Sequence, residues 1–102
     1  MPAFQKKLNQ FRNQIDRIDS KILRLLNQRF EVVRRVVRLK KAHQLKIYDP
    51  RREHVLLARL EEKNKKLKGA LPSKRLRQIY RAIMACSRQT QKQILQQWSI
   101  KK

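Results

Sequence analysis

Charged and polar residues interrupt the otherwise regular apolar pattern of the first forty residues. Apolar residues recur at alternating spacings of three and four from Leu8 to Leu25 and again from Val32 to Leu39, which is typical of a helix with one buried seam. Arg29 stands on this seam, and Lys40, eleven residues later, returns to nearly the same face. A buried cation is costly unless an opposite charge meets it. Arg29 and Lys40 therefore either bind an anion, or Arg29 reaches solvent or a Glu and Lys40 complements the helix C-terminus.

Two later apolar stripes carry similar interruptions. Glu53 precedes Leu56 and Leu57 by three and four residues, so we expect it on their helix face, although it also suits the helix dipole. Ser87 and Gln91 are four apart and share a face of the third stripe. Taken singly, Ser87 could bond back to its own helix, and Gln91 could belong to an exposed polar run at 89–93. Together the interruptions predict a small, cation-lined polar pocket for a small anion inside a helical bundle.

Three helices account for these stripes, at about 4–42, 50–66 and 72–98. Asp49 followed by Pro50 predicts a helix start, and Gly69 with Pro72 predicts a helix end followed by another start. With one Gly and three Pro, a turn-rich β architecture is disfavoured, so the chain is expected to be all-α.

The first helix is too long for a compact monomer. Its expected length is about 58 Å, whereas a compact chain of this size would be about 33 Å across. A second copy related by a two-fold axis is the simplest cover for its apolar stripe. The alternative is a monomer whose first helix breaks near the middle.

Composition limits the other possibilities. The 102 residues suffice for one small domain, 1–102, and 28 Lys and Arg against 7 Asp and Glu give a net charge of +21. This charge favours an anionic partner and some non-specific affinity for nucleic acid, although the basic residues are spread over all three helical segments. A single Cys, Cys86, fits a reducing, cytoplasmic environment. The first residues lack the apolar core of a signal peptide, and no apolar run is long enough to span a membrane. His43 and His54 belong to no metal-binding motif, so we expect no metal, and no nucleophile set suggests covalent catalysis.

Five stretches resemble a known family in both order and spacing. They are FRNQIDRIDSKILRLLNQR, VVRLKK, IYDPRRE, LP and IMACSRQTQ. With them the chain is similar to the all-helical, AroQ-type chorismate mutases from about Leu8 to Gln96. The resemblance implies an isomerase that rearranges chorismate to prephenate without a cofactor, in phenylalanine and tyrosine biosynthesis. The 102 residues leave no room for the dehydratase or dehydrogenase domain to which such domains are often fused. We therefore expect a stand-alone, monofunctional mutase, or else an excised or designed domain. It also implies a homodimer in which long first helices intertwine and the active sites are shared.

The resemblance assigns four residues to the anionic groups of the substrate. Arg12 would reach across the dimer to a substrate carboxylate, and Arg29 would clamp a carboxylate within its own chain. Ser87 would support a carboxylate, and Arg52 would add positive charge to the pocket.

Four further residues would address the remaining oxygens of the substrate. Lys40 and Gln91 would hydrogen-bond the ether oxygen, on which negative charge grows as the C–O bond breaks. Glu53 and Asp49, the latter through its backbone, would address the ring hydroxyl. The catalytic residues implied are Lys40, Gln91, Arg29 and Glu53.

Three alternative functions are weaker. An isochorismate–pyruvate lyase would share the scaffold, but such lyases tend to lack the Glu and Ser that stand here as Glu53 and Ser87. A basic helical nucleic-acid-binding protein would explain the charge but not polar residues on apolar stripes. A non-catalytic relative would not need the full residue set. The family is not usually this basic, and the charge could steer a dianionic substrate.

Overall fold

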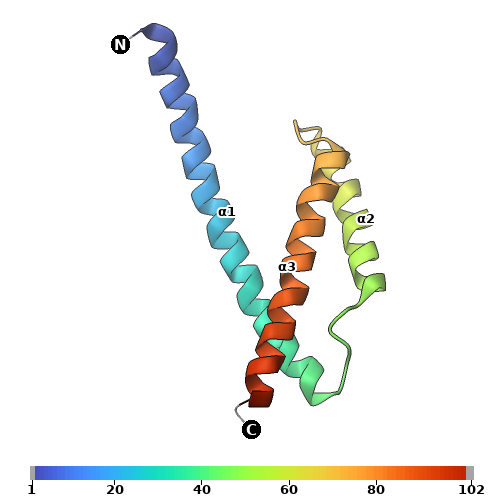
Figure 1. The fold of residues 1–102 in the computed structure, drawn as a ribbon. Helices are drawn as coiled ribbons and strands as arrows, with labels where there is room; N and C mark the ends of the chain where they lie inside the picture. Colours follow the sequence, from blue (N-terminus) through green and yellow to red (C-terminus); the bar gives the residue numbers. More distant parts are fainter. Residues whose placement is uncertain (1, 101–102) are drawn as a thin grey trace. The chain divides into compact units, whose positions relative to one another are not determined.

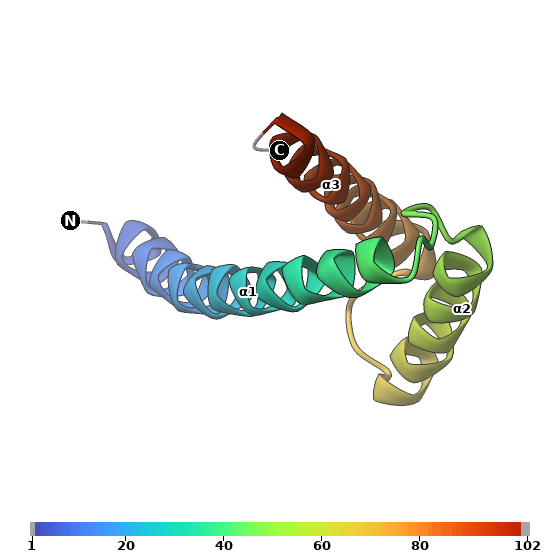
Figure 2. The same cartoon turned by 90° about the horizontal axis from the view of Figure 1, so that it is seen from below.

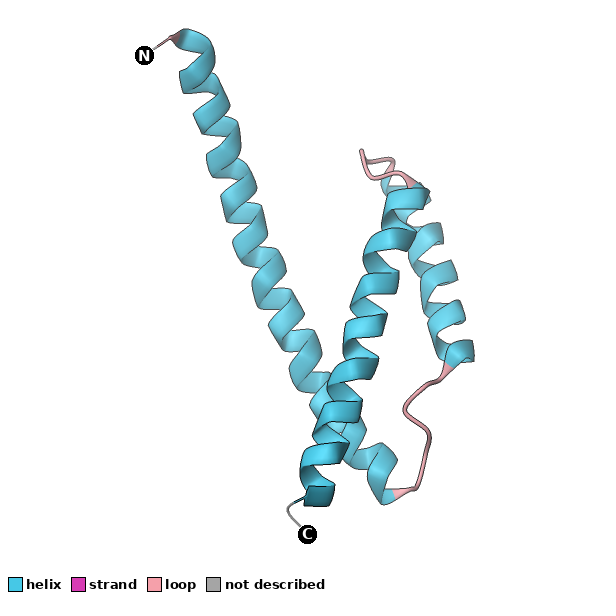
Figure 3. Ribbon diagram, in the orientation of Figure 1, coloured by secondary structure: helices cyan, strands magenta, loops and turns pink. Residues whose placement is uncertain are grey.

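The computed structural model describes the backbone of residues 2–100 and the side chains of residues 2–98. Three helices follow one another: α1 (Ala3–Ala42), α2 (Pro50–Leu67) and α3 (Ser73–Ile100) (Figure 1). Within residues 2–100 every regular element is a helix (Figure 3). The all-α fold class is therefore confirmed, and α1 runs unbroken over nearly the predicted range.

The ends of the helices follow local signals with two exceptions. Asp49 caps α2 as predicted, because its side chain accepts a hydrogen bond of 3.0 Å from the backbone N–H of Arg52 and Pro50 follows it. At the other end of α2 the left-handed residue is Lys68, with φ 51°, and not Gly69. The start predicted at Pro72 shifts to Ser73, because the Pro72 carbonyl accepts the first helical bond, from Leu76 N–H at 3.0 Å.

The chain divides into two compact units, one ending at Val32 and one starting at Val33, and each is described by itself. The boundary falls inside α1. The single domain predicted over 1–102 stays a prediction. In the first unit the seam side chains are exposed in the single chain, with Ile15 and Ile18 each 54% exposed. The exposed seam residues of this unit are Leu8, Phe11, Ile15, Ile18, Ile22, Leu25 and Val32.

In the second unit α2 packs against α3. A salt bridge of 3.0 Å between Arg77 and Glu61 joins the two helices, and Asn64 donates a hydrogen bond of 2.8 Å to the Leu71 carbonyl across their connection. The buried apolar side chains are Val37, Leu76 and Met84. The loop of residues 43–49 leads from the end of α1 to the start of α2 (Figure 2).

Candidate functional site

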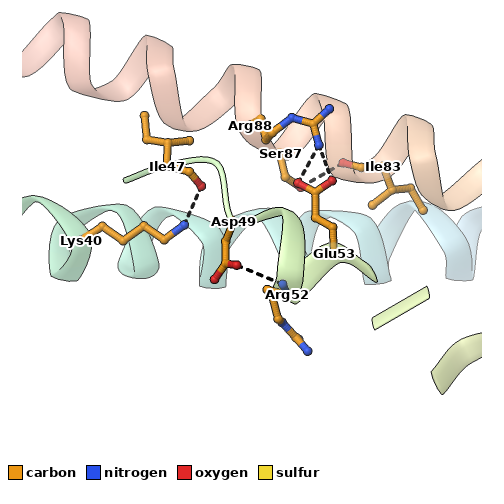
Figure 4. Close-up of polar contacts among 8 residues, drawn as sticks. All are labelled: Lys40, Ile47, Asp49, Arg52, Glu53, Ile83, Ser87 and Arg88. Carbon is orange, nitrogen blue, oxygen red and sulfur yellow. Dashed lines mark hydrogen bonds and ion pairs between the residues drawn. The ribbon is translucent and has the colours of Figure 1, made fainter. Parts of the chain in front are cut away.

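Lys40 is held in place by the end of α1. The Leu45 N–H bonds the Lys40 carbonyl at 2.8 Å, the Gln44 N–H bonds the Lys41 carbonyl at 3.2 Å, and Gln44 has φ 55°. This pair of bonds is a Schellman motif, which fixes the last turn of the helix. The Lys40 ammonium donates to the Ile47 carbonyl at 2.8 Å (Figure 4) and to the Gln91 side-chain oxygen at 3.3 Å. Lys40 is therefore positioned by two neutral oxygens, and the second contact joins α1 to α3.

Gln91 and Ser87 are the buried polar side chains among the described residues, with 7% and 6% of their surfaces exposed. The alternative that Gln91 lies in an exposed polar run is therefore wrong, because its helix face turns inward with that of Met84. Ser87 does bond back to its own helix, donating to the Ile83 carbonyl at 3.0 Å (Figure 4). The shared face predicted for Ser87 and Gln91 is confirmed by their burial.

Glu53 also turns toward the interior, as predicted, and meets a cation that the sequence argument missed. One guanidinium nitrogen of Arg88, Nη1, donates to both carboxylate oxygens of Glu53, at 2.6 Å for Oε2 and in a short contact for Oε1 (Figure 4). The guanidinium carbon lies 4.9 Å from the centroid of the Tyr48 ring. The pKa of Arg88 is raised above its usual value, chiefly by its hydrogen bond to Glu53 and against the opposing effect of burial. The Arg88 guanidinium thus stays charged over the range in which enzymes work.

Asp49 and Arg52 flank this group at the start of α2. The Asp49 carboxylate is used as the helix cap, and its carbonyl accepts from the Glu53 N–H at 3.1 Å. Arg52 is exposed, and its side chain points away from the Glu53 carboxylate (Figure 4). Asp49 therefore orients the first turn that carries Glu53.

The remaining two predicted residues, Arg12 and Arg29, lie on α1 in the unit that ends at Val32. Arg12 is exposed and Arg29 is half-buried. The contacts predicted for both cations, with substrate carboxylates, stay predictions.

The second unit thus holds two fixed polar pairs of different character. At Lys40 and Gln91, a cation bound to neutral oxygens stands beside a primary amide, a combination suited to an oxygen that gains negative charge. At Glu53 and Arg88, a carboxylate that is paired with a cation can still accept a hydrogen bond from a hydroxyl group on another lone pair. Among the residues that the structure describes, no three His, Cys, Asp or Glu side chains are grouped to hold a metal ion. In the same part of the chain, no helix combines the length and apolar character needed to cross a membrane.

These features define an all-α domain with a built, cation-bearing polar site. The model of the chorismate mutase type II family matches residues 11–92. The chain belongs to this family. It is 36% identical over 90 residues to a bifunctional chorismate mutase/prephenate dehydratase of Aquifex aeolicus, a match covering 87% of this chain and 25% of the relative. It is 38% identical over 74 residues to an enzyme of the same description from Neisseria gonorrhoeae, covering 72% of this chain and 19% of the relative. The chain thus spans a quarter or less of the length of these curated relatives.

Proposed function

We propose that this chain catalyses the Claisen rearrangement of chorismate to prephenate, in the route to phenylalanine and tyrosine. The observation that carries the proposal is the contact of 3.3 Å between Lys40 and the buried Gln91. It sets a cation and an amide side by side in a chain that belongs to the chorismate mutase type II family.

The reaction breaks the ether C–O bond and forms a C–C bond within one molecule, so it needs no cofactor and no nucleophile. Negative charge grows on the ether oxygen as the C–O bond lengthens. Lys40 donates to this oxygen and keeps its full charge for it, because its acceptors in the chain are neutral. The side-chain oxygen of Gln91 accepts a hydrogen bond from Lys40. The amide nitrogen of Gln91 is then left to donate to the ether oxygen. Donors that meet the developing charge bind the transition state better than the ground state.

The other groups of the substrate are bound by residues of both subunits. Arg29 of the same chain binds one carboxylate, and Arg12 of the partner subunit binds the other. Together they hold the enolpyruvyl chain over the ring, which removes rotational freedom before the reaction. Ser87 supports a carboxylate, and Arg52 adds positive potential at longer range. Glu53 accepts a hydrogen bond from the ring hydroxyl, with the Asp49 backbone beside it.

The proposed assembly is a homodimer in which the α1 helices intertwine and each copy contributes to the other's site. The support is the run of exposed apolar side chains along α1, from Leu8 through Phe11, Ile15 and Ile18 to Ile22. Exposed apolar stripes of this regularity mark interaction surfaces. A second copy offers the same stripe around a two-fold axis.

The activity is tested by the loss of chorismate ultraviolet absorbance on adding purified protein, with the products identified by chromatography. Prephenate from the wild type, lost with Arg29→Ala and kept with Arg17→Ala, is the expected result. Arg17 is a matched control because it lies exposed on the same helix, away from the apolar seam. No turnover of chorismate, together with release of pyruvate from isochorismate, would replace the mutase proposal with the lyase.

The shared site is tested by mixing two inactive variants. An Arg12→Ala subunit paired with a Lys40→Met subunit has one site with both defects and one site with neither. Random exchange of subunits therefore restores about a quarter of the wild-type activity. No restoration after exchange has been verified by mass spectrometry would show that Arg12 does not act across the dimer.

A second proposal concerns polyanions and rests on the net charge of +21. We propose weak, non-specific nucleic-acid binding that falls steeply with salt, since it would depend on release of counterions. A titration of DNA at two ionic strengths tests it, and affinity independent of salt would refute it.

The single Cys86 supports a further proposal, location in the reducing cytoplasm.

A further inference from the structure

Arg88 is one of the charged residues of the second unit to which neither the sequence pattern nor the family resemblance assigns a role. It comes from α3, and its Nη1 bridges both oxygens of the Glu53 carboxylate on α2. Its guanidinium carbon lies 4.9 Å from the centre of the Tyr48 ring, which comes from the loop before α2. Residues of three separate segments thus meet at the Arg88 guanidinium.

The geometry leaves the carboxylate able to bind a ligand. A single guanidinium nitrogen uses one lone pair on each oxygen of Glu53, so each oxygen keeps another. The side chains of Arg88 and Glu53 keep 30% and 23% of their surfaces exposed. The aromatic face of Tyr48 restricts the guanidinium plane, because a cation prefers to lie over the ring. The carboxylate therefore has a set orientation and an open side.

Resting on the function proposed above, we propose that Arg88 is a positioning residue that aims the Glu53 carboxylate at the ring hydroxyl of the substrate, with Tyr48 as its platform. Arg88 does not touch the reacting atoms. It neutralises the carboxylate, so a substrate with two negative charges can approach Glu53 without repulsion, and it fixes the direction of the accepting lone pairs. The hydroxyl keeps its place throughout the rearrangement, so this contact contributes equally to the ground state and the transition state.

The same two helices carry a control. Arg77 on α3 pairs with Glu61 on α2 at 3.0 Å, with 39% and 27% of the side-chain surfaces exposed. If Arg88 only joined α2 to α3, its removal would resemble the removal of Arg77. Pairs as exposed as these contribute little to stability, so both variants should remain folded.

The experiment compares kcat and KM for wild type, Arg88→Met, Arg88→Lys and Arg77→Met, with melting temperatures as a check on folding. Arg88→Met should raise KM about tenfold and leave kcat within about twofold, as expected for the loss of uniform binding. Arg88→Lys should recover part of the affinity, because Lys restores the positive charge but not the planar, rigid arrangement of guanidinium donors. Arg77→Met should leave KM unchanged. If Arg88→Met does not fold, Arg88→Lys against Arg77→Lys makes the same comparison.

Two further measurements separate positioning from a structural role. In the Glu53→Gln background, Arg88→Met should change KM by less than about twofold, because Arg88 acts through Glu53. With a chorismate analogue that lacks the ring hydroxyl, the loss of affinity caused by Arg88→Met should be smaller than with chorismate, because only the repulsion by Glu53 remains. An active wild type with equal KM values for Arg88→Met and Arg77→Met would overturn the role of Arg88 alone. A wild type that fails to convert chorismate would overturn the proposed function, and the role of Arg88 with it.

Discussion

Replacing Gln91 by Glu gives the sharpest test of the reaction site, because it changes one nitrogen to an oxygen. The wild-type amide cannot ionise, so its donor is present at every pH. In the Gln91→Glu variant the group lies 93% out of solvent and 3.3 Å from the Lys40 ammonium, if it keeps the place of the amide. An ionised carboxylate there accepts from Lys40 and offers no donor to the ether oxygen.

The size of the effect follows from the loss of one donor at a developing oxyanion, about 10²- to 10³-fold in kcat. The loss should be reversed on acidification, because the protonated carboxyl is a donor again. Each pH unit below neutrality should recover about tenfold in rate until the carboxyl is mostly protonated, since the protonated fraction changes tenfold per unit. The wild-type rate should stay nearly flat across neutral pH.

The assay is the loss of chorismate absorbance at constant ionic strength, from about pH 8 down to about pH 4, a range that extends to the ordinary pKa of a Glu carboxyl. Gln89→Glu is the matched control, since Gln89 is exposed on the same helix, and its profile should follow the wild type. A flat profile for Gln91→Glu would refute the reasoning, and so would a steep fall of the wild-type kcat between about pH 6 and pH 8.

The other predictions concern the cation, the helix cap and the net charge. Lys40→Met should lower kcat by about 10²- to 10³-fold with an unchanged circular dichroism spectrum, because it removes the charge at the ether oxygen; an active variant would remove Lys40 from the mechanism. Asp49→Ala should destabilise the fold by about 1 kcal/mol, because it removes the cap of α2, and lower the melting temperature by about 4–8 °C; calorimetry measures this, and an unchanged melting temperature would contradict it. Raising the ionic strength should lower kcat/KM while kcat stays constant, because a charge of +21 steers a dianion; a fall in kcat itself would point to disruption of the site or the assembly.

The sequence predicts features that short-range rules decide. The N-cap at Asp49 needs only a carboxylate and a following Pro50, and the structure reproduces it. The burial of Gln91 follows from its position one turn after Ser87 on an apolar stripe. The left-handed conformation after α2 is less predictable from the sequence, since Lys68 adopts it and Gly69 does not. The left-handed conformation costs a residue other than Gly roughly 1–2 kcal/mol, which the geometry of the connection can outweigh.

The role of Arg88 could not be found by such rules. Its partner Glu53 is 35 positions away in the sequence, and the contact depends on how α2 and α3 are rotated about their axes. Arg88 also lies in a chain with 28 Lys and Arg, where one further cation carries no signal. The available hint was Glu53 itself, because a carboxylate that faces an apolar stripe needs a cation nearby.

In the proposed site, the two polar pairs bind different parts of a charged substrate. Lys40 is held by a carbonyl and an amide oxygen, so its charge is not cancelled by the contacts that place it. Arg88 is held by a carboxylate, so the Arg88–Glu53 pair is nearly neutral. An oxygen that becomes negative is favoured at Lys40, and a hydroxyl that stays neutral is favoured at Glu53. A bound chorismate with its ether oxygen at Lys40 and its ring hydroxyl at Glu53 would satisfy both preferences, whereas the reverse orientation would place the growing negative charge at a nearly neutral pair and away from the Lys40 ammonium. In the proposed mechanism, the identity of the groups that hold each cation therefore selects the orientation in which the substrate reacts.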